Sequence, residues 1–234
     1  MLMRKFFITL IATAIFPTLA NAELNIRNYD KLKNECEKGD VNACYEVGLG
    51  YEFGGSGTLE RLPSMAKKYY EKACARENAE SCRRIGLFYE ENVFNIDARE
   101  SFLKAINYYD QACDFRSPVG CYQLGDLFKK ERNFYRAKHA YLESCNLNNK
   151  DACSSLAEMY MEGIGVKKSY AMAKLVYEKG CILEDSKSCF NLGWLYWNGF
   201  GATQSKRTAR EYFELSCDLG FSDGCSIVRK LDNR

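Results

Sequence analysis

Cysteine is the residue type whose spacing says most about this chain, because thiols can ligate metals, exchange electrons or form disulfides. On one straight helix, two cysteines eight residues apart would be separated by roughly 12 Å, beyond the reach of a disulfide. The twelve cysteines stand in six pairs with that offset: Cys36 and Cys44, Cys74 and Cys82, Cys113 and Cys121, Cys145 and Cys153, Cys181 and Cys189, and Cys217 and Cys225. The chain must therefore turn between them. We expect each pair to join the two helices of a hairpin through a disulfide, which we call a staple.

Metal binding is the alternative role for these cysteines, and the sequence does not favour it. Structural metal sites typically combine C-x-x-C spacings with histidines. The chain has no C-x-x-C, and His139 is its single histidine. We therefore expect no bound metal and no other cofactor.

The first 22 residues have the pattern of an export signal. Arg4 and Lys5 precede an apolar run over residues 6–16, and Ala20 and Ala22 form a small-residue cleavage site. Residues 1–22 are predicted to be a signal peptide removed near Ala22, which would leave residues 23–234 periplasmic or secreted. Such compartments permit disulfides. After residue 22 the sequence has no run of about 18 apolar residues, so we expect no transmembrane segment in the mature chain.

The charge balance limits the partners that we expect. The whole chain carries 33 Lys and Arg against 31 Asp and Glu, and the predicted signal peptide holds two of the basic residues. The mature chain would therefore be neutral, with 31 residues of each sign. A neutral chain without an evident basic stripe argues against nucleic acid or an anionic membrane as the main partner, although local charged patches remain compatible with it.

The cysteine pairs also mark an internal repeat. Successive pairs are 38, 39, 32, 36 and 36 residues apart, close to the period of helix-turn-helix solenoids. Counted from the second cysteine of a pair, position +3 is aliphatic, +4 is small and +7 is aromatic, so one helical face is apolar. These positions hold Val47, Ile85, Leu124, Leu156, Leu192 and Val228; Gly48, Gly86, Gly125, Ala157 and Gly193; and Tyr51, Tyr89, Phe128, Tyr160 and Tyr196. We call this helix of each repeat helix A.

A second helix, helix B, precedes the next cysteine pair. Counted back from that pair's first cysteine, −8 is alanine and −4 is aromatic: Ala66, Ala105, Ala137, Ala173 and Ala209; Tyr70, Tyr109, Tyr141, Tyr177 and Phe213. Position −12 holds Ser101, Asn133, Ser169 and Ser205, which we expect to cap the start of helix B; Pro63 suits the same role in the first repeat. Glycine-rich turns separate A from B at residues 54–57, 163–165 and 199–201.

This pattern predicts an all-α protein, a right-handed solenoid of antiparallel helix pairs that forms one domain over residues 23–234 with five to six repeats. Residues 160–181 and 189–201 resemble Sel1-like repeats, relatives of the tetratricopeptide repeats, and the resemblance covers residues 28–232. The eight-residue cysteine offset resembles the Helicobacter cysteine-rich protein family of exported Sel1-like solenoids. That resemblance implies disulfides from the end of one helix B to the start of the next helix A, in agreement with the helix geometry.

Proteins of the cysteine-rich family are described as β-lactamases or penicillin-binding proteins, so the resemblance implies a hydrolase as one alternative. A serine β-lactamase uses S-x-x-K, S-D-N and K-T-G elements. Here Ser64 and Lys67 fit the first element, and the other two are missing. The same residues also suit the first turn of a helix B, with Lys67 at the surface. His139 has no nucleophile matched to it and is expected at the surface. Nitrocefin turnover compared with a Ser64→Ala variant would decide the question.

Binding is the function that the sequence favours. Positions +2, +5 and +9 of helix A lie opposite the repeated apolar face and vary between repeats, and the first helices of such solenoids usually line the concave surface. We therefore expect a groove for a peptide, a protein or a glycan such as a peptidoglycan-like ligand. Its candidate residues are Glu46, Arg84, Gln123, Asp126, Asn191, Trp194 and Asn198. An ordinary solvated face is the alternative, and Trp194 could equally pack against a neighbouring repeat.

A third hypothesis comes from similarity to the disulfide-rich Sel1-like assembly factors of the mitochondrial intermembrane space. It implies a redox or cofactor-assembly helper. No C-x-x-C redox motif supports it. The exported binding scaffold is therefore the preferred hypothesis.

Overall fold

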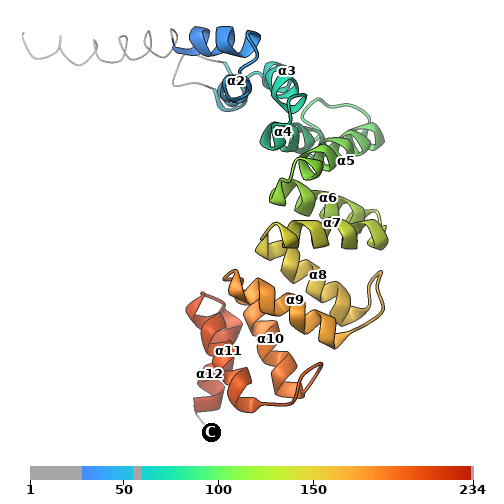
Figure 1. Cartoon of the computed structure of the whole chain (residues 1–234), viewed down its shortest axis with the longest axis vertical. Coiled ribbons are helices and arrows are strands. Elements are labelled where there is room, and N and C mark those ends of the chain that lie inside the picture. Colours follow the sequence, from blue (N-terminus) through green and yellow to red (C-terminus); the bar gives the residue numbers. More distant parts are fainter. Residues whose placement is uncertain (1–27, 55–59, 233–234) are drawn as a thin grey trace, which may run out of the picture. The chain divides into compact units, whose positions relative to one another are not determined.

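In the computed structural model, which describes residues 28–54 and 60–232, every regular element of those residues is an α-helix (Figure 1). The predicted signal peptide and most of the glycine-rich turn at 54–57 lie outside the described residues. No described helix is both long and apolar enough to cross a bilayer.

The helices alternate as the repeat predicts. Residues 28–37 form the first described helix. The A helices are α2 (Val41–Phe53), α4 (Ala79–Glu90), α6 (Pro118–Lys130), α8 (Lys150–Glu162), α10 (Ser186–Asn198) and the final α12 (Ser222–Asp232). The B helices are α3 (Pro63–Cys74), α5 (Ala98–Asp114), α7 (Phe134–Asn146), α9 (Tyr170–Ile182) and α11 (Lys206–Asp218).

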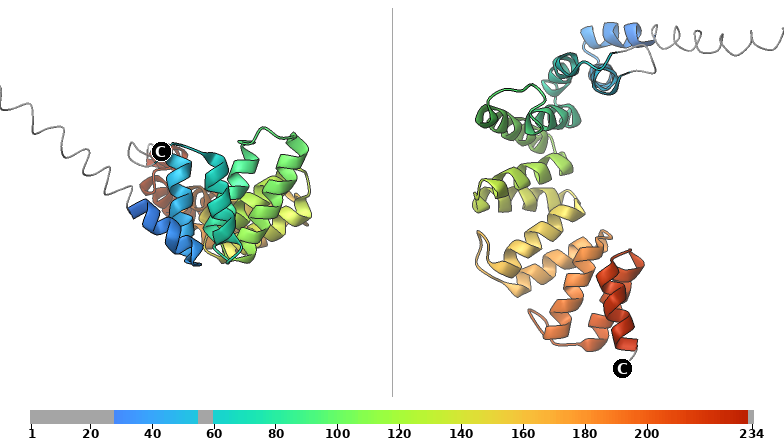
Figure 2. Two further views of the ribbon diagram at one scale, coloured as in Figure 1. Left: turned by 90° about the horizontal axis from the view of Figure 1, so that it is seen from above. Right: turned by 180° about the vertical axis from the view of Figure 1, so that it is seen from behind.

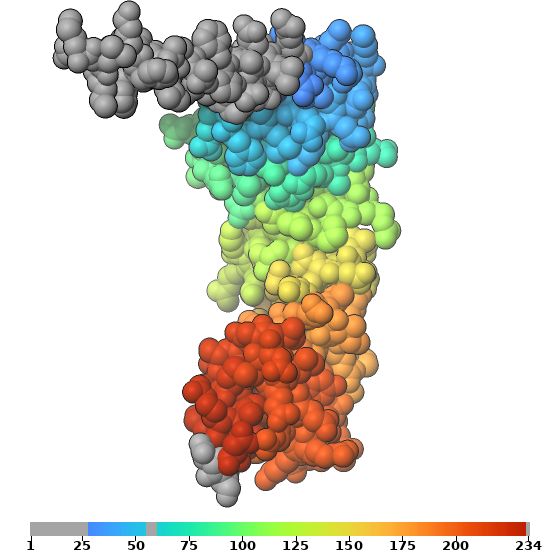
Figure 3. Space-filling model, turned by 90° about the vertical axis from the view of Figure 1, so that its left-hand side faces the viewer, coloured from blue at the N-terminus to red at the C-terminus, as the bar shows by residue number. Residues whose placement is uncertain are grey.

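The described residues divide into two compact units, with the division after Ala105. In the first unit, α3 packs on both α2 and α4. In the second, each helix B packs on its own helix A and on the helix A that follows: α7 on α6 and α8, α9 on α8 and α10, and α11 on α10 and α12. Within residues 106–234 the repeats therefore follow one another in sequence order, from green to red (Figures 2 and 3).

Six disulfides join the cysteines that are eight residues apart, which confirms the predicted pairing. They link Cys36 to Cys44, Cys74 to Cys82, Cys113 to Cys121, Cys145 to Cys153, Cys181 to Cys189 and Cys217 to Cys225. Each connects the end of one helix to the start of the next helix A, with Cα atoms 4.5–4.9 Å apart. All twelve cysteines are used in this way. The staples thus close each turn before a helix A and leave no thiol for metal binding or exchange.

Every stapled turn has the same backbone. The third residue after the first cysteine has a positive φ between 61° and 104°: Gly39, Glu77, Arg116, Asn148, Glu184 and Gly220. The next residue caps helix A in five turns, where its side chain accepts a hydrogen bond from the amide three residues on: Asp40, Asn78, Ser117, Asn149 and Asp185. The cysteine offset predicted that the chain turns here, and the structure shows that these turns also cap the start of the next helix.

In the core, the −4 aromatic ring of helix B packs directly on the small +4 residue of helix A. A Cβ atom on Gly48, the +4 residue of α2, would lie 2.4 Å from the ring of Tyr70, the −4 residue of α3. Gly125 and Gly193 relate in the same way to the −4 rings of α7 and α11, at 2.6 and 2.7 Å. These three rings are at most 1 % exposed. The small +4 residue is therefore needed because it lets helix B approach helix A closely.

One predicted helix start is wrong. Asn133, Ser169 and Ser205 accept hydrogen bonds from first-turn amides as expected, and Pro63 begins α3. Helix α5, however, begins at Ala98, three residues before Ser101. The carboxylate of Asp97 accepts from the amide of Glu100 at 2.9 Å, so this strong capping residue starts the helix earlier. Ser101 is instead buried and its hydroxyl donates to the Tyr89 carbonyl at 2.6 Å.

The stapled turns give a stability prediction. Glu184 has φ 61°, a left-handed conformation that costs a residue with a Cβ about 1–2 kcal/mol. Glu184→Gly should therefore raise the free energy of unfolding by about 0.5–1 kcal/mol, once the larger entropy of unfolded glycine is subtracted. Gly220 has φ 90° with nothing within 4 Å of a built Cβ, so Gly220→Ala should lower it by about 1 kcal/mol through the backbone alone. Urea unfolding measures both, and changes of the same sign would contradict the strain argument.

Candidate functional site

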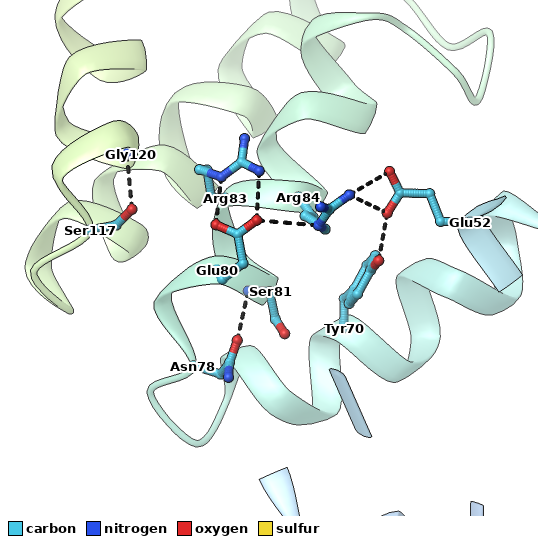
Figure 4. A network of polar contacts seen from close by, with 9 residues as sticks. All are labelled: Glu52, Tyr70, Asn78, Glu80, Ser81, Arg83, Arg84, Ser117 and Gly120. Carbon is cyan, nitrogen blue, oxygen red and sulfur yellow. Dashed lines mark hydrogen bonds and ion pairs between the residues drawn. The ribbon is translucent and has the colours of Figure 1, made fainter. Parts of the chain in front are cut away.

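The predicted binding residue Arg84 lies in a polar network formed by α2, α3 and α4 of the first unit (Figure 4). Its guanidinium donates to both carboxylate oxygens of Glu52 in α2 at 2.9 Å and lies 3.3 Å from Glu80. The hydroxyl of Tyr70 donates to the same Glu52 carboxylate at 2.5 Å. Side-chain exposure is 17 % for Arg84 and 8 % for Glu52. The network is thus a largely desolvated ion pair supported by a phenol.

Burial and charge act together on these groups. Burial, with Glu52 adding to it, raises the pKa of Tyr70 well above the usual range for tyrosine, so the phenol stays a donor. Burial is the largest single influence on the pKa of Arg84 and would lower it, but the Glu52 carboxylate, Tyr45 and Tyr70 together outweigh burial and raise that pKa. Removing one partner of such a pair costs about 3–5 kcal/mol, because the other charge remains buried without its counterion. Arg84 is therefore held in place by the fold, and its role in binding stays a prediction.

The same arrangement recurs in the second unit with other partners. Tyr141 of α7 donates to Asp126 of α6 at 2.5 Å, and Tyr177 of α9 is hydrogen-bonded to Asn191 of α10. Burial first, and then neighbouring carboxylates, raise the pKa of Tyr141 and Tyr177. Hence Tyr141 and Tyr177 hold two predicted binding residues of helix A, Asp126 and Asn191, in fixed positions.

The remaining predicted residues are placed as follows. Glu46 is exposed on α2, and Gln123 is half-buried on α6. Trp194 on α10 is 37 % exposed, while its ring packs edge-on against Phe213 at 5.6 Å between centroids. Asn198 is exposed, and its side-chain amide donates to the Trp194 carbonyl at 2.9 Å. Trp194 therefore both packs against α11, as the alternative hypothesis allowed, and keeps part of its ring at the surface.

Sequence analysis missed Glu52. It is at position +8 of helix A, outside the variable row that was considered. A signal was available, because four of the five −4 aromatics are tyrosines and a buried phenol requires a hydrogen-bond partner. An acid one turn beyond the small +4 residue was the nearest candidate.

The hydrolase candidates lie in α3. Ser64 is exposed in the first turn of this helix. The ammonium of Lys67 lies 2.5 Å from the Glu71 carboxylate, one turn further along, so this lysine belongs to an i,i+4 ion pair. His139 is exposed on α7, where its ring meets Tyr135 edge-on at 4.6 Å. Among the described residues, no cluster of three or more His, Cys, Asp or Glu side chains could hold a metal ion.

Two open hollows lie on the second unit, on either side of Tyr135. The first, of about 360 Å³, is lined on α5 and α7 by Asp110, Arg136, His139 and Glu143, and burial raises the pKa of Asp110, with Asp114 adding to it. The second, of about 560 Å³, lies between α7 and the α8–α9 loop. Its charged lining residues are Lys138, Lys167 and Lys168. Sequence analysis did not find this basic hollow.

The repeats match a known family. The model of the Sel1 repeat matches residues 41–78, 79–114, 150–184 and 186–221, which together make up more than half of the chain. The chain belongs to the Sel1 repeat family. With its six staples it is a cysteine-rich member, as the sequence predicts. The stretch between the second and third matches contains α6 and α7.

Relatives of this Sel1 repeat protein include the cytochrome c oxidase assembly factor 7 of Xenopus tropicalis, which is 28 % identical over 150 residues. The match covers 59 % of this chain and 63 % of that protein's length. Among solved structures, a Sel1 repeat protein from Oxalobacter formigenes aligns with a TM-score of 0.70 at 20 % identity, over 87 % of this chain and 85 % of its own. The cysteine-rich protein B of Helicobacter pylori is 30 % identical, over 56 % of this chain and 97 % of its own, with a TM-score of 0.47.

The tyrosine network yields a matched comparison. Tyr70→Phe removes a donor from Glu52, which is almost fully buried, and should lower the free energy of unfolding by about 1–2 kcal/mol. Tyr141→Phe makes the same change beside Asp126, which is half-buried and can take water in place of the phenol. Its cost should be smaller. Urea unfolding of both variants measures the difference, and equal costs would show that burial of the acid is not what makes the hydroxyl necessary.

Proposed function

We propose that this chain is an exported scaffold that binds a peptide or protein partner through the surface of its A helices. A Sel1 repeat fold fits a protein-binding role. The observation that supports this surface is its fixed side chains: Asp126 and Asn191 are held by buried tyrosines, and Trp194 is held by Phe213. Side chains that are already ordered lose little entropy when a ligand binds.

Trp194 is the residue that we assign as the anchor. Tryptophan is enriched among the few interface residues that carry most of the binding energy. Its ring is packed on one side and 37 % exposed in total, so a partner could bury the remaining surface without reordering the side chain. Asn198, one turn further along α10, supplies an exposed amide beside it. A peptidoglycan-like or other glycan ligand for the same surface is the alternative, because tryptophan and amide side chains also suit sugars.

Export is supported by the predicted signal peptide and by the six disulfides, which are compatible with a periplasmic or extracellular location. The leader in residues 1–22 accounts for entry into an oxidising compartment, where the staples can form and persist. We place the mature scaffold there.

A role in the assembly of a larger complex is the second candidate, favoured by the identity to cytochrome c oxidase assembly factor 7. The chain spans 63 % of that relative's length. Because all twelve cysteines are in disulfides, such a role would rest on binding a component and not on thiol exchange. The same surface would serve it.

The anchor role of Trp194 can be tested by cross-linking in the cells that export the protein. With a photoreactive residue at position 198, Trp194→Ala should remove the cross-linked partner while the melting curve shifts only modestly. Leu192→Ala on the same helix is the control, because Leu192 is fully buried and its truncation should cost about 2–5 kcal/mol. Tyr196, which the sequence places in the core, is half-buried against Tyr212 and suits this control less well.

Unchanged cross-linking in Trp194→Ala would rule out the anchor role. A loss of stability as large as that of Leu192→Ala would show that Trp194 serves the core.

A further inference from the structure

The hollow between α7 and the α8–α9 loop combines positive charge with exposed apolar surface. It is lined by Tyr135, Lys138, Tyr160, Gly165, Val166, Lys167, Lys168, Ser169 and Met172. Three lysines and no carboxylate are among these residues. Tyr135 is 68 % exposed and Met172 is 41 % exposed. The hollow therefore offers an apolar wall beside a cluster of ammonium groups.

These ammonium groups have no acidic partner within residues 28–54 and 60–232, where ion pairs to lysine are otherwise common. Lys67, Lys104 and Lys174, for example, each pair with a glutamate four residues away. No carboxylate of the described residues lies within ion-pair distance of Lys138, Lys167 or Lys168. The ammonium group of Lys168 makes a cation–π contact with Tyr170, 4.8 Å from the centre of the ring. The positive charge of the hollow is therefore not neutralised by the fold.

A glycine builds this hollow. Gly165 has φ 67°, and a Cβ atom there would lie 2.3 Å from the Cβ of Phe134 and 3.0 Å from its carbonyl carbon. Only glycine lets the α8–α9 loop (Figure 1) lie directly against the start of α7. That contact brings Val166, Lys167 and Lys168 beside Tyr135 and Lys138, which are distant in sequence.

The next repeat has the same loop without the charge. Gly201, at φ 67°, lies against Tyr170 as Gly165 lies against Phe134. The amides of Ser169 and Ser205 donate to equivalent carbonyls, those of Tyr160 and Tyr196, both at 2.9 Å. Yet Thr203 and Gln204 stand where the first loop has Lys167 and Lys168, and Lys174, the counterpart of Lys138, is paired with Glu178. The loop can thus form without lysines, so the fold does not require the basic character of the hollow.

We propose that this hollow is a second docking site, on the B-helix side of the protein, for an acidic segment of a partner protein. Carboxylates of the segment would pair with Lys138, Lys167 and Lys168, and an apolar side chain between them would cover Tyr135 and Met172. Charge complementarity selects this occupant, since the ammonium groups are unpaired and the whole chain is otherwise near neutrality. A volume of about 560 Å³ accommodates several side chains. A flat membrane surface could not enter a hollow, and three lysines are too few to follow a nucleic-acid backbone.

The site does not depend on the A-helix surface, and its test is separate. The probe is a fluorescently labelled acidic peptide, Glu-Asp-Leu-Phe-Glu-Asp, and its neutral counterpart, Gln-Asn-Leu-Phe-Gln-Asn, is the control ligand. Fluorescence anisotropy with the oxidised protein should show binding of the acidic peptide only. Binding should weaken strongly at about 1 M salt, where the Debye length is about 3 Å.

The decisive variant carries Lys167→Thr and Lys168→Gln, the residues of the next repeat's loop, and should fold as the wild type does. Its affinity for the acidic peptide should fall at least about tenfold. Lys38→Thr with Lys230→Gln removes the same charge at two other exposed positions and should leave the affinity unchanged. Tyr135→Ala should weaken binding through the apolar wall.

Three outcomes would overturn the proposal. The neutral peptide could bind as well as the acidic one, or the loop variant could bind like the wild type. Alternatively, the protein could ignore both peptides and bind phosphatidylglycerol vesicles through Lys167 and Lys168, which would make the hollow a membrane contact. Trp194→Ala should leave peptide binding intact, so a failure here is distinguishable from a failure of the A-helix proposal.

Discussion

A disulfide that closes each turn between helix B and the next helix A is the constraint on which the rest of this structure depends. Each staple closes a short loop, for which the chain-entropy model gives about 2.5 kcal/mol. A typical domain has a net stability of about 5–15 kcal/mol, so the summed contribution of a few staples is comparable to the net stability of an ordinary domain. This explains how the turns tolerate Glu77, Arg116 and Glu184 in a left-handed conformation that suits glycine better.

Within that constraint, one aromatic ring performs two tasks in α3 and in α7, where it is Tyr70 and Tyr141. The −4 ring fills the space left by the small +4 residue and fixes the distance between the helices. The hydroxyls of Tyr70, Tyr141 and Tyr177 are hydrogen-bonded to polar groups of helix A, which are Glu52, Asp126 and Asn191 respectively. Packing and the order of the binding surface therefore have the same cause. The partner of the hydroxyl differs from repeat to repeat while the ring does not, which separates framework from recognition.

Much of this was predictable because the repeat supplies its own comparison. The eight-residue offset, from Cys36 and Cys44 onward, predicted the staples, and the repeated +4 and −4 positions predicted the core. The predicted start of α5 was wrong because two capping residues lie close together in the sequence. Asp97 caps this helix in place of Ser101, and only the structure shows which of them is used.

Contacts between distant segments account for the rest. The ion pair of Arg84 was not foreseen because Glu52, its most buried partner, comes from another helix, α2. The basic hollow was missed for a similar reason. Its lysines come together only because Gly165 lies against Phe134. These two segments are distant in sequence, and no local sequence pattern predicts their contact.

The most direct test of the account is the stability of the same protein with its disulfides intact and fully reduced. Urea unfolding followed by circular dichroism should show that reduction moves the midpoint to much lower urea, or abolishes the helical signal before urea is added. High salt should move it far less, since several ion pairs of the described residues have both partners exposed and contribute little. A reduced protein that unfolds at the same urea concentration as the oxidised one would contradict the account, because helix packing alone would then hold the repeats together.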